Sequence, residues 1–320
     1  MSAIVEIKGL NKQYGKRKAV DDVSMTIESG EIFGLVGPNG AGKTTTMRML
    51  VTLLKPDKGE IQVGGYSIRK SPREVRRQIG FMPDDFGVYG DLTVHEYLDF
   101  FGACYAIPNA QRPGLISDLL DLVDIGHRRD DMVDTLSRGL KQRLGLARVL
   151  IHDPSVLVLD EPASGLDPRA RVEIRELLLE VARLGKTIIF SSHILADVAE
   201  LCTRVGIMEG GKLVALGALD QLSQQVVPHR ILRISLLKTG NIEQAQAALS
   251  GSPGISAVRL QAGLAQTTRL ELEVDFSGDD QALHALLETL LKQGLPVVQF
   301  REDTQILEEV FMRATRGIVS

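Results

Sequence analysis

The order of apolar and polar positions predicts alternating strands and helices over the first two thirds of the chain. Residues 32–36, 156–159 and 187–191 are mostly apolar, which is typical of strands buried on both faces of a parallel sheet. Residues 4–7 and 23–27 instead alternate apolar and polar side chains, as half-buried strands do. Two further strands are predicted at residues 58–65 and 79–83. This pattern indicates an α/β fold.

A helical region separates the two groups of strands. Thr93 and Glu96 match the capping-box pattern, which predicts a helix from this point to about Tyr105. Further helical stretches follow, so we expect a helical subdomain at about residues 86–150. Within it, Ser137 stands at the start of a helix whose apolar positions share one face, where its hydroxyl and nearby N–H groups can receive a phosphate.

The last third of the chain has a different pattern and predicts a separate small domain. Alternating strands are expected at three places and amphipathic helices at two, followed by a last strand. In chain order these are residues 232–236, 242–249, 258–260, 270–276, 283–291 and 298–300. The order βαββαβ suggests a ferredoxin-like α+β fold, closed by a helix at 306–311. We therefore expect one domain over residues 1–225 and a second over 229–320, with a boundary at 223–228.

Composition narrows the possible classes of protein. With 320 residues, of which 44% are hydrophobic and 24% charged, the chain is typical of a globular protein with one large and one small domain. It shows neither a signal-peptide profile nor an uncharged apolar run long enough to cross a bilayer. A net charge of -4 argues against a broad basic face for nucleic acid. Cys104 and Cys202 are expected to be buried free thiols in a reducing compartment.

The strongest chemical motif lies between the strand at 32–36 and a predicted helix at 46–54. It follows the phosphate-binding pattern G-x-x-x-x-G-K-[ST] with Gly37, Pro38, Asn39, Gly40, Ala41, Gly42, Lys43, Thr44 and Thr45. We expect the three glycines to permit φ angles that turn the backbone N–H groups toward the phosphates. Lys43 would place a positive charge on the β- and γ-phosphates, and the Thr44 hydroxyl would bind Mg²⁺. The motif predicts a nucleoside triphosphate site.

Further candidate residues fall at the ends of predicted strands. Asp160 and Glu161 follow the strand at 156–159, where carboxylates lie beside a phosphate loop in an α/β sheet. We expect Asp160 to hold Mg²⁺ and Glu161 to polarise the attacking water. His193 ends the next strand and should reach the same edge as Glu161. Tyr14, in a turn upstream of the loop, is a candidate for stacking on adenine.

Together these motifs resemble the ATP-binding subunit of ABC transporters. The resemblance covers roughly residues 4–225. It rests on Tyr14, Gly37–Thr45, Leu136–Gln142, Asp160–Glu161, Ser164–Asp167 and His193. The resemblance implies a RecA-like P-loop core with an antiparallel β subdomain and an α-helical subdomain. It also implies ATP hydrolysis with Mg²⁺ in a head-to-tail homodimer. There Ser137 and Gly139 of one copy would close on ATP held by Gly37–Thr45 of the other, and Asp167 is a further candidate for binding the nucleotide.

The resemblance also implies partners and a location. An integral-membrane permease on a separate chain would be driven by the ATPase, which would lie in the cytoplasm, peripheral on the inner face of the cell membrane. No nucleic-acid partner is expected. The segment Ala163–Arg171 and the motif variations are similar to the exporter-type, ABC-2-like branch. An importer ATPase with a regulatory C-terminal domain, and an ABC ATPase acting on ribosomes or DNA, remain as alternatives.

Two positions depart from the commonest pattern of the family. The signature reads Leu-Ser-Arg-Gly-Leu where Leu-Ser-Gly-Gly-Gln is usual, so Arg138 keeps a backbone donor and Leu140 loses a side-chain contact to nucleotide. The loop position usually held by glutamine is Asp84, which can bind Mg²⁺ or orient water but brings negative charge near the phosphates. The C-terminal domain shows no chemical motif, and dimer support or packing is favoured for it over ligand sensing.

Overall fold

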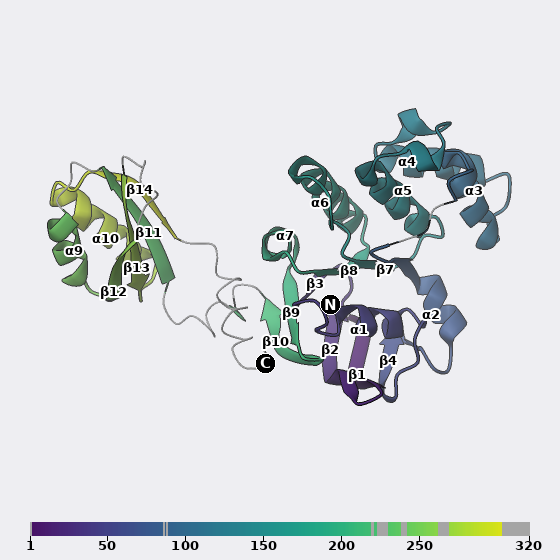
Figure 1. Ribbon diagram of the computed structural model, residues 1–320, viewed down its shortest axis with the longest axis horizontal. Helices are drawn as coiled ribbons and strands as arrows, with labels where there is room; N and C mark the ends of the chain where they lie inside the picture. The colour runs from purple at the N-terminus through teal and green to yellow at the C-terminus, as the bar shows by residue number, and fades with distance from the viewer. Residues whose placement is uncertain are drawn as a thin grey trace. The chain divides into compact units, whose positions relative to one another are not determined.

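A computed structural model describes residues 2–85, 87, 89–218, 221–222, 230–237, 242–261 and 269–302. The described residues divide into two compact units, the first within residues 1–219 and the second within residues 220–313 (Figure 1). The boundary predicted at 223–228 and the closing helix predicted at 306–311 lie outside the described residues.

The first unit is built on a six-stranded sheet in the order β10-β9-β3-β8-β7-β6. All neighbouring strands in it run parallel except β10, which pairs antiparallel with β9. The strands are β3 (Ile32–Val36), β6 (Ile79–Met82), β7 (Val156–Asp160), β8 (Thr187–Ser192), β9 (Arg204–Glu209) and β10 (Lys212–Ala218). Every residue of β3, β7 and β8 is buried, as their apolar sequences predict.

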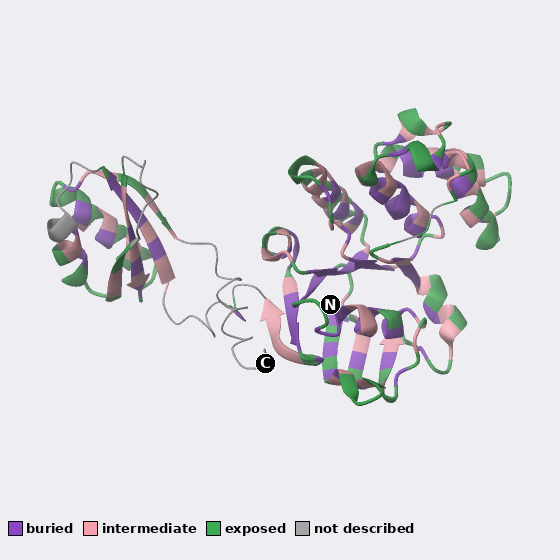
Figure 2. Ribbon diagram, viewed as in Figure 1, coloured by how far each residue is buried: buried purple, intermediate pink, exposed green. Residues whose placement is uncertain are grey.

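A second sheet of four antiparallel strands packs on one face of the first, in the order β2-β1-β4-β5. Its strands are β1 (Ala3–Tyr14), β2 (Arg17–Glu28), β4 (Lys58–Val63) and β5 (Tyr66–Ser67). One apolar core joins the inner faces of both sheets to helix α1 (Lys43–Leu50) (Figure 2). This arrangement places the start of α1 at the carboxyl end of β3, where a parallel sheet binds its ligands.

Helices form the rest of the first unit. They are α2 (Pro72–Gln78), α3 (Val94–Cys104), α4 (Arg112–Leu122), α5 (Arg138–Leu150), α6 (Pro168–Arg183) and α7 (Leu195–Leu201), with 3-10 turns η1 (Gly126–Arg128) and η2 (Val133–Thr135). In Figure 1, α3, α4 and α5 form a helical group of their own, and α6 and α7 cover the face of the parallel sheet opposite α1. The RecA-like core, the antiparallel β subdomain and the helical subdomain are therefore confirmed.

Local signals explain where two of these helices begin. Thr93 and Glu96 form the predicted capping box: the Thr93 hydroxyl accepts from the Glu96 N–H at 3.2 Å, and a Glu96 carboxylate oxygen accepts from the Thr93 N–H at 2.8 Å. Ser137 is the N-cap of α5, where its hydroxyl accepts from the Leu140 N–H at 3.4 Å, without a reciprocal bond because the residue three positions on is a leucine. One expectation here is wrong: Cys104, at the end of α3, is exposed, whereas Cys202 is buried as predicted.

The helix after the phosphate loop also differs from the expectation of residues 46–54. It begins at Lys43, inside the loop motif, and ends at Leu50. The chain leaves the helix because Thr52 has a φ of 65°, a left-handed conformation that does not continue a helix. Because α1 begins at Lys43, inside the motif, the N–H groups of its first turn belong to the phosphate loop itself.

The second unit has the fold predicted for it. Its elements are β11 (Arg230–Leu237), α9 (Ile242–Ser250), β12 (Ile255–Gln261), β13 (Arg269–Phe276), α10 (Asp280–Lys292) and β14 (Val297–Glu302). The antiparallel sheet has the order β12-β13-β11-β14, which is the ferredoxin-like arrangement of a βαββαβ chain. Alternate residues of β11 and β13, such as Ile234 and Val274, pack with Leu286 and Leu290 of α10 in a separate core.

None of the helices in the described part of the chain combines the length and the apolar character that a membrane crossing requires.

Candidate active site

The phosphate loop joins the end of β3 to the start of α1, and its glycines have two different tasks. Gly40 and Gly42 have φ angles of 82° and 108°, conformations that side chains with a Cβ rarely adopt. Gly37 does not have a positive φ, which corrects the expectation for this residue. It is needed for space, because a Cβ there would overlap the carbonyl oxygen of Met208 on the neighbouring strand β9.

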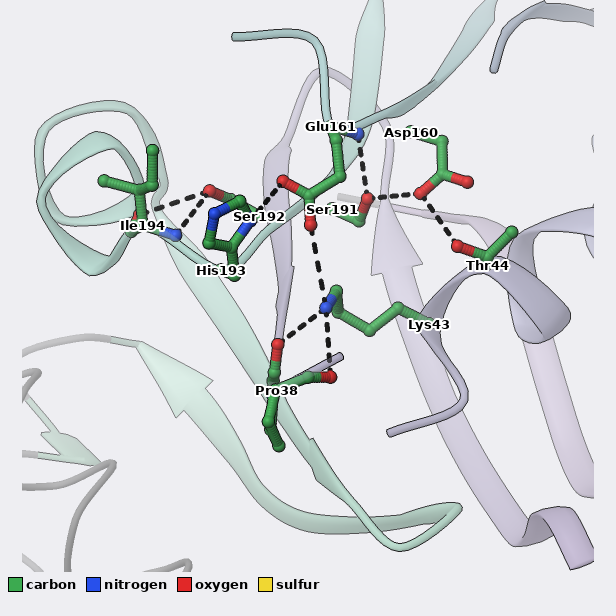
Figure 3. A network of polar contacts seen from close by, with 10 residues as sticks. Pro38, Lys43, Thr44, Asp160, Glu161, Ser191, Ser192, His193 and Ile194 are labelled. Atoms are coloured by element: carbon green, nitrogen blue, oxygen red, sulfur yellow. Dashed lines mark hydrogen bonds and ion pairs between the residues drawn. The ribbon is translucent and has the colours of Figure 1, made fainter. Parts of the chain in front are cut away.

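Lys43 is held at the centre of the loop by its own backbone. The Lys43 Nζ donates to the carbonyl oxygen of Gly37 at 2.6 Å and to that of Pro38 at 3.3 Å, and it lies 3.6 Å from Glu161 Oε1 (Figure 3). The side chain is only 6% exposed, and this burial lowers the pKa of Lys43 while Glu161 and Asp160 oppose the shift. The negative charge of a bound polyphosphate would also oppose the lowering of the Lys43 pKa, so binding of an anion would favour the protonated amine.

The end of β7 brings two carboxylates to the loop. Asp160 is 3% exposed, and its Oδ1 lies 3.3 Å from the Thr44 hydroxyl. The next residue, Glu161, has a φ of 52°, an uncommon conformation for a residue with a side chain. This bend aims the Glu161 carboxylate at Lys43 while Asp160 faces Thr44 (Figure 3). The two neighbouring acids therefore serve different parts of the site.

His193 reaches Glu161 from the end of β8, as its position in the sequence suggests. Its Nδ1 lies 2.8 Å from Glu161 Oε2. Because a carboxylate only accepts, Nδ1 carries the proton in this hydrogen bond. The imidazole is 46% exposed, so its other nitrogen is available to a ligand.

One cavity of about 410 Å³ gathers most of the candidate residues. It is lined by Tyr14, Arg17, Ala19, Asn39, Gly40, Ala41, Gly42, Lys43, Thr44, Thr45, Asp84, Asp160 and Glu161. Burial raises the pKa of Asp84, and the nearby carboxylates of Asp160 and Glu161 raise it further. This is the electrostatic cost of an acid at a position usually held by glutamine.

The oxygen atoms in this cavity suit Mg²⁺. Thr44 and Asp160 place a hydroxyl and a carboxylate side by side, and Asp84 adds a second carboxylate to the cavity wall. Hard oxygen ligands supplied partly by protein and partly by phosphate are what Mg²⁺ prefers. The donors present therefore fit a magnesium ion that binds together with a nucleotide.

Ser137, Gly139 and Asp167 lie in a different cavity, of about 430 Å³. Ser137 is the N-cap of α5 and Asp167 the N-cap of α6, where its Oδ1 accepts from the Ala170 N–H at 2.9 Å. Two helix N-termini thus border one hollow, which favours an anion. Within one chain, these residues do not share the cavity of Lys43 and Glu161.

Two residues that the sequence reasoning missed take part in the site. The Ser191 hydroxyl donates to Asp160 Oδ1 at 2.6 Å and accepts from the Glu161 N–H at 3.0 Å, so it fixes both acids. Arg17 donates to the Gly40 carbonyl oxygen at 3.1 Å and lines the nucleotide-sized cavity. The only sequence signal for Arg17 is its place in the basic run Lys16-Arg17-Lys18, just after Tyr14. The sequence signal for Ser191 is its place at the end of the strand predicted at 187–191, two residues before His193.

We expect Ser191→Ala to lower both stability and turnover. The substitution removes the shorter of the two hydroxyl hydrogen bonds to the buried Asp160 carboxylate and leaves only the 3.3 Å contact from Thr44, which costs about 1–3 kcal/mol. It also removes the acceptor of the Glu161 N–H. Thermal unfolding and steady-state ATPase assays would measure the two effects. Ser29→Ala, at an exposed serine, is the matched control. Unchanged melting temperature and turnover in Ser191→Ala would contradict this role.

Comparison with known proteins agrees with the geometry. Residues 20–164 match the family model described as "ABC transporter". The linearmycin resistance ATP-binding protein LnrL of Bacillus subtilis is 31% identical over 314 residues, covering 98% of each chain. The chain belongs to the ATP-binding subunits of ABC transporters. This confirms the resemblance drawn from its motifs, and it makes the protein an ATPase.

Other members of the ABC transporter family are similar over different lengths. The Nod factor export ATP-binding protein I of Ralstonia nicotianae is 34% identical over 98% of this chain and 94% of its own. The structure of cbiO1 from Clostridium perfringens, described as part of the ABC transporter complex cbiONQ, is 29% identical. It covers 71% of this chain and 97% of its own with a TM-score of 0.63. Relatives named for resistance and export are consistent with the exporter-type branch.

Proposed function

We propose that this chain is the ATP-hydrolysing motor of an exporter, binding MgATP between two copies and driving a separate membrane permease. The observation that carries this proposal is the separation of two cavities in one chain. One contains Lys43 and Glu161, and the other is bordered by the helix starts at Ser137 and Asp167. Neither cavity is a complete site, because donors for a transferred phosphoryl group are needed opposite the phosphate loop.

Within each site, we assign the residues as follows. Tyr14 stacks on adenine, the loop Gly37–Thr45 cradles the phosphates, and Lys43 neutralises charge on the β- and γ-phosphates. Mg²⁺, held by Thr44, Asp160 and Asp84, would offset the negative charge that develops on the phosphoryl oxygens.

Glu161 is assigned as the residue that takes the proton of the attacking water. Its second oxygen is held by His193 Nδ1 at 2.8 Å, which orients the carboxylate. To brace the γ-phosphate with its other nitrogen at the same time, His193 must be doubly protonated, because a phosphate oxygen only accepts. Ser137 and Gly139 of the second copy donate to the γ-phosphate from the opposite side.

A mixing experiment tests the head-to-tail dimer. Lys43→Ala removes the charge from one half of the site, and Ser137→Glu places a repelling carboxylate in the other half while remaining favourable at a helix start. We expect each variant alone to be almost inactive. A mixture should recover roughly a quarter of the wild-type rate, because half of the dimers are mixed and each mixed dimer holds one complete site. A mixture as inactive as its components would contradict the shared site.

Co-purification from detergent-solubilised membranes tests the partner. We expect a polytopic membrane protein to accompany the chain, which would place it peripherally on the cytoplasmic face of the membrane. The export names of its relatives favour export as the direction. Recovery with ribosomes or DNA and no membrane protein would instead support a different class of ABC ATPase. In this proposal residues 1–225 are the ATPase domain, and residues 229–320 support the dimer or pack against that domain.

A further inference from the structure

Arg138 stands at the start of α5, between Ser137 and Gly139, where the signature usually has a small residue. Its guanidinium lies directly over Gly165. A Cβ on Gly165 would be 2.6 Å from the Arg138 Cζ, 2.7 Å from Nη1 and 2.9 Å from Nη2. Gly165 also has a φ of 66°, so its position is specific to glycine in both space and conformation. The large side chain at 138 is therefore accommodated by a close contact with a neighbouring loop.

The loop under Arg138 connects the two cavities of the chain. It leaves the nucleotide cavity at Glu161, whose carbonyl oxygen accepts from the Ser164 N–H at 3.0 Å. It reaches the second cavity at Asp167, the N-cap of α6. Arg138 touches this loop at Gly165, close to its middle. A displacement of the α5 start would therefore act on the segment that carries Glu161.

We propose that Arg138 is a positioning residue that links the two half-sites of one chain by holding the loop after Glu161 through its contact with Gly165. This inference rests on the proposed function. Ser137 and Gly139, which flank Arg138, are proposed to contact the nucleotide bound by the partner copy, so binding of that nucleotide acts first on the start of α5. The contact of Arg138 with Gly165 then transmits this effect along the loop to Glu161 of the same chain. Arg138 affects turnover in this arrangement without contacting nucleotide.

The experiment replaces the side chain that lies over Gly165. Arg138→Gly should lower kcat about tenfold with KM for ATP unchanged, within the range of substitutions along a coupling path. Arg138→Lys keeps the charge but not the planar guanidinium over Gly165, so it should recover only part of the loss. Arg73→Gln, on the exposed side of α2, is the control.

Two outcomes would overturn the inference. Wild-type kcat in Arg138→Gly would show that the residue has no positioning role. A raised KM with unchanged kcat would place Arg138 on the partner's nucleotide instead. Arg138→Gln serves as a second variant if the glycine weakens the start of α5. A wild-type chain without ATPase activity would refute the proposed function itself, so the two failures are distinguishable.

Discussion

Glu161→Gln is expected to lower the rate of ATP hydrolysis by about 10²- to 10⁴-fold, the usual cost of losing a general base. The substitution keeps the size and shape of the side chain but removes the charge 3.6 Å from Lys43 Nζ and the acceptor of the His193 hydrogen bond in its carboxylate form. ATP binding should persist, because no negative group is added and the phosphate loop is unchanged. Single-turnover assays with radiolabelled ATP, together with nucleotide titration, would separate the two effects.

Glu176→Gln is the matched control for this prediction. Glu176 is an exposed residue of α6 and takes no part in the site, so its substitution removes one charge from the same unit without touching the chemistry. Its turnover should equal that of the wild type. Hydrolysis at the wild-type rate in Glu161→Gln would remove Glu161 from the proposed role and leave the proton of the attacking water to another group.

Lys43→Ala is expected to weaken ATP binding by about 10- to 100-fold, as for the loss of a hydrogen bond to a charged group. The Lys43 amine is buried between the Gly37 and Pro38 carbonyl oxygens and the Glu161 carboxylate, so no other cation of the described site occupies its place. Binding of a fluorescent ATP analogue, measured by titration, would give the change in Kd. Hydrolysis should fall as well, because the same charge acts on the γ-phosphate.

The control for this variant is Lys70→Ala, at an exposed lysine outside both cavities. A thermal unfolding scan of Lys43→Ala is needed beside it, because the substitution removes two hydrogen bonds that hold the loop. A folded Lys43→Ala chain with the wild-type Kd for ATP would show that the backbone N–H groups alone bind the phosphates.

Patterns within short stretches of sequence were sufficient to predict most of the fold. The buried strands at 32–36, 156–160 and 187–192 follow from continuous apolar runs, and the start of α3 follows from the pair Thr93 and Glu96. The ferredoxin-like second unit follows from the order of its strand and helix periodicities. Each of these signals is local, since it depends on residues that are close in the chain.

Contacts between distant segments were not predictable in the same way. Ser191 bonds Asp160 from a neighbouring strand, and Gly37 is restricted by the carbonyl of Met208 on β9 rather than by its own φ angle. The exposure of Cys104 depends on which face of α3 the rest of the helical subdomain covers. None of these facts leaves a repeating pattern in the sequence, because each pairs residues far apart in the chain.

The sequence by itself determined which candidate groups this protein carries: the phosphate loop, the acids after β7, the histidine after β8 and the signature residues can all be located from it. Only the tertiary structure decided how they are distributed, with Lys43 and Glu161 in one cavity and Ser137 and Asp167 bordering another. It also decided that Arg138 lies over Gly165. The physical reason is that a motif specifies which atoms are present, whereas the packing of helices on a sheet specifies which of those atoms meet.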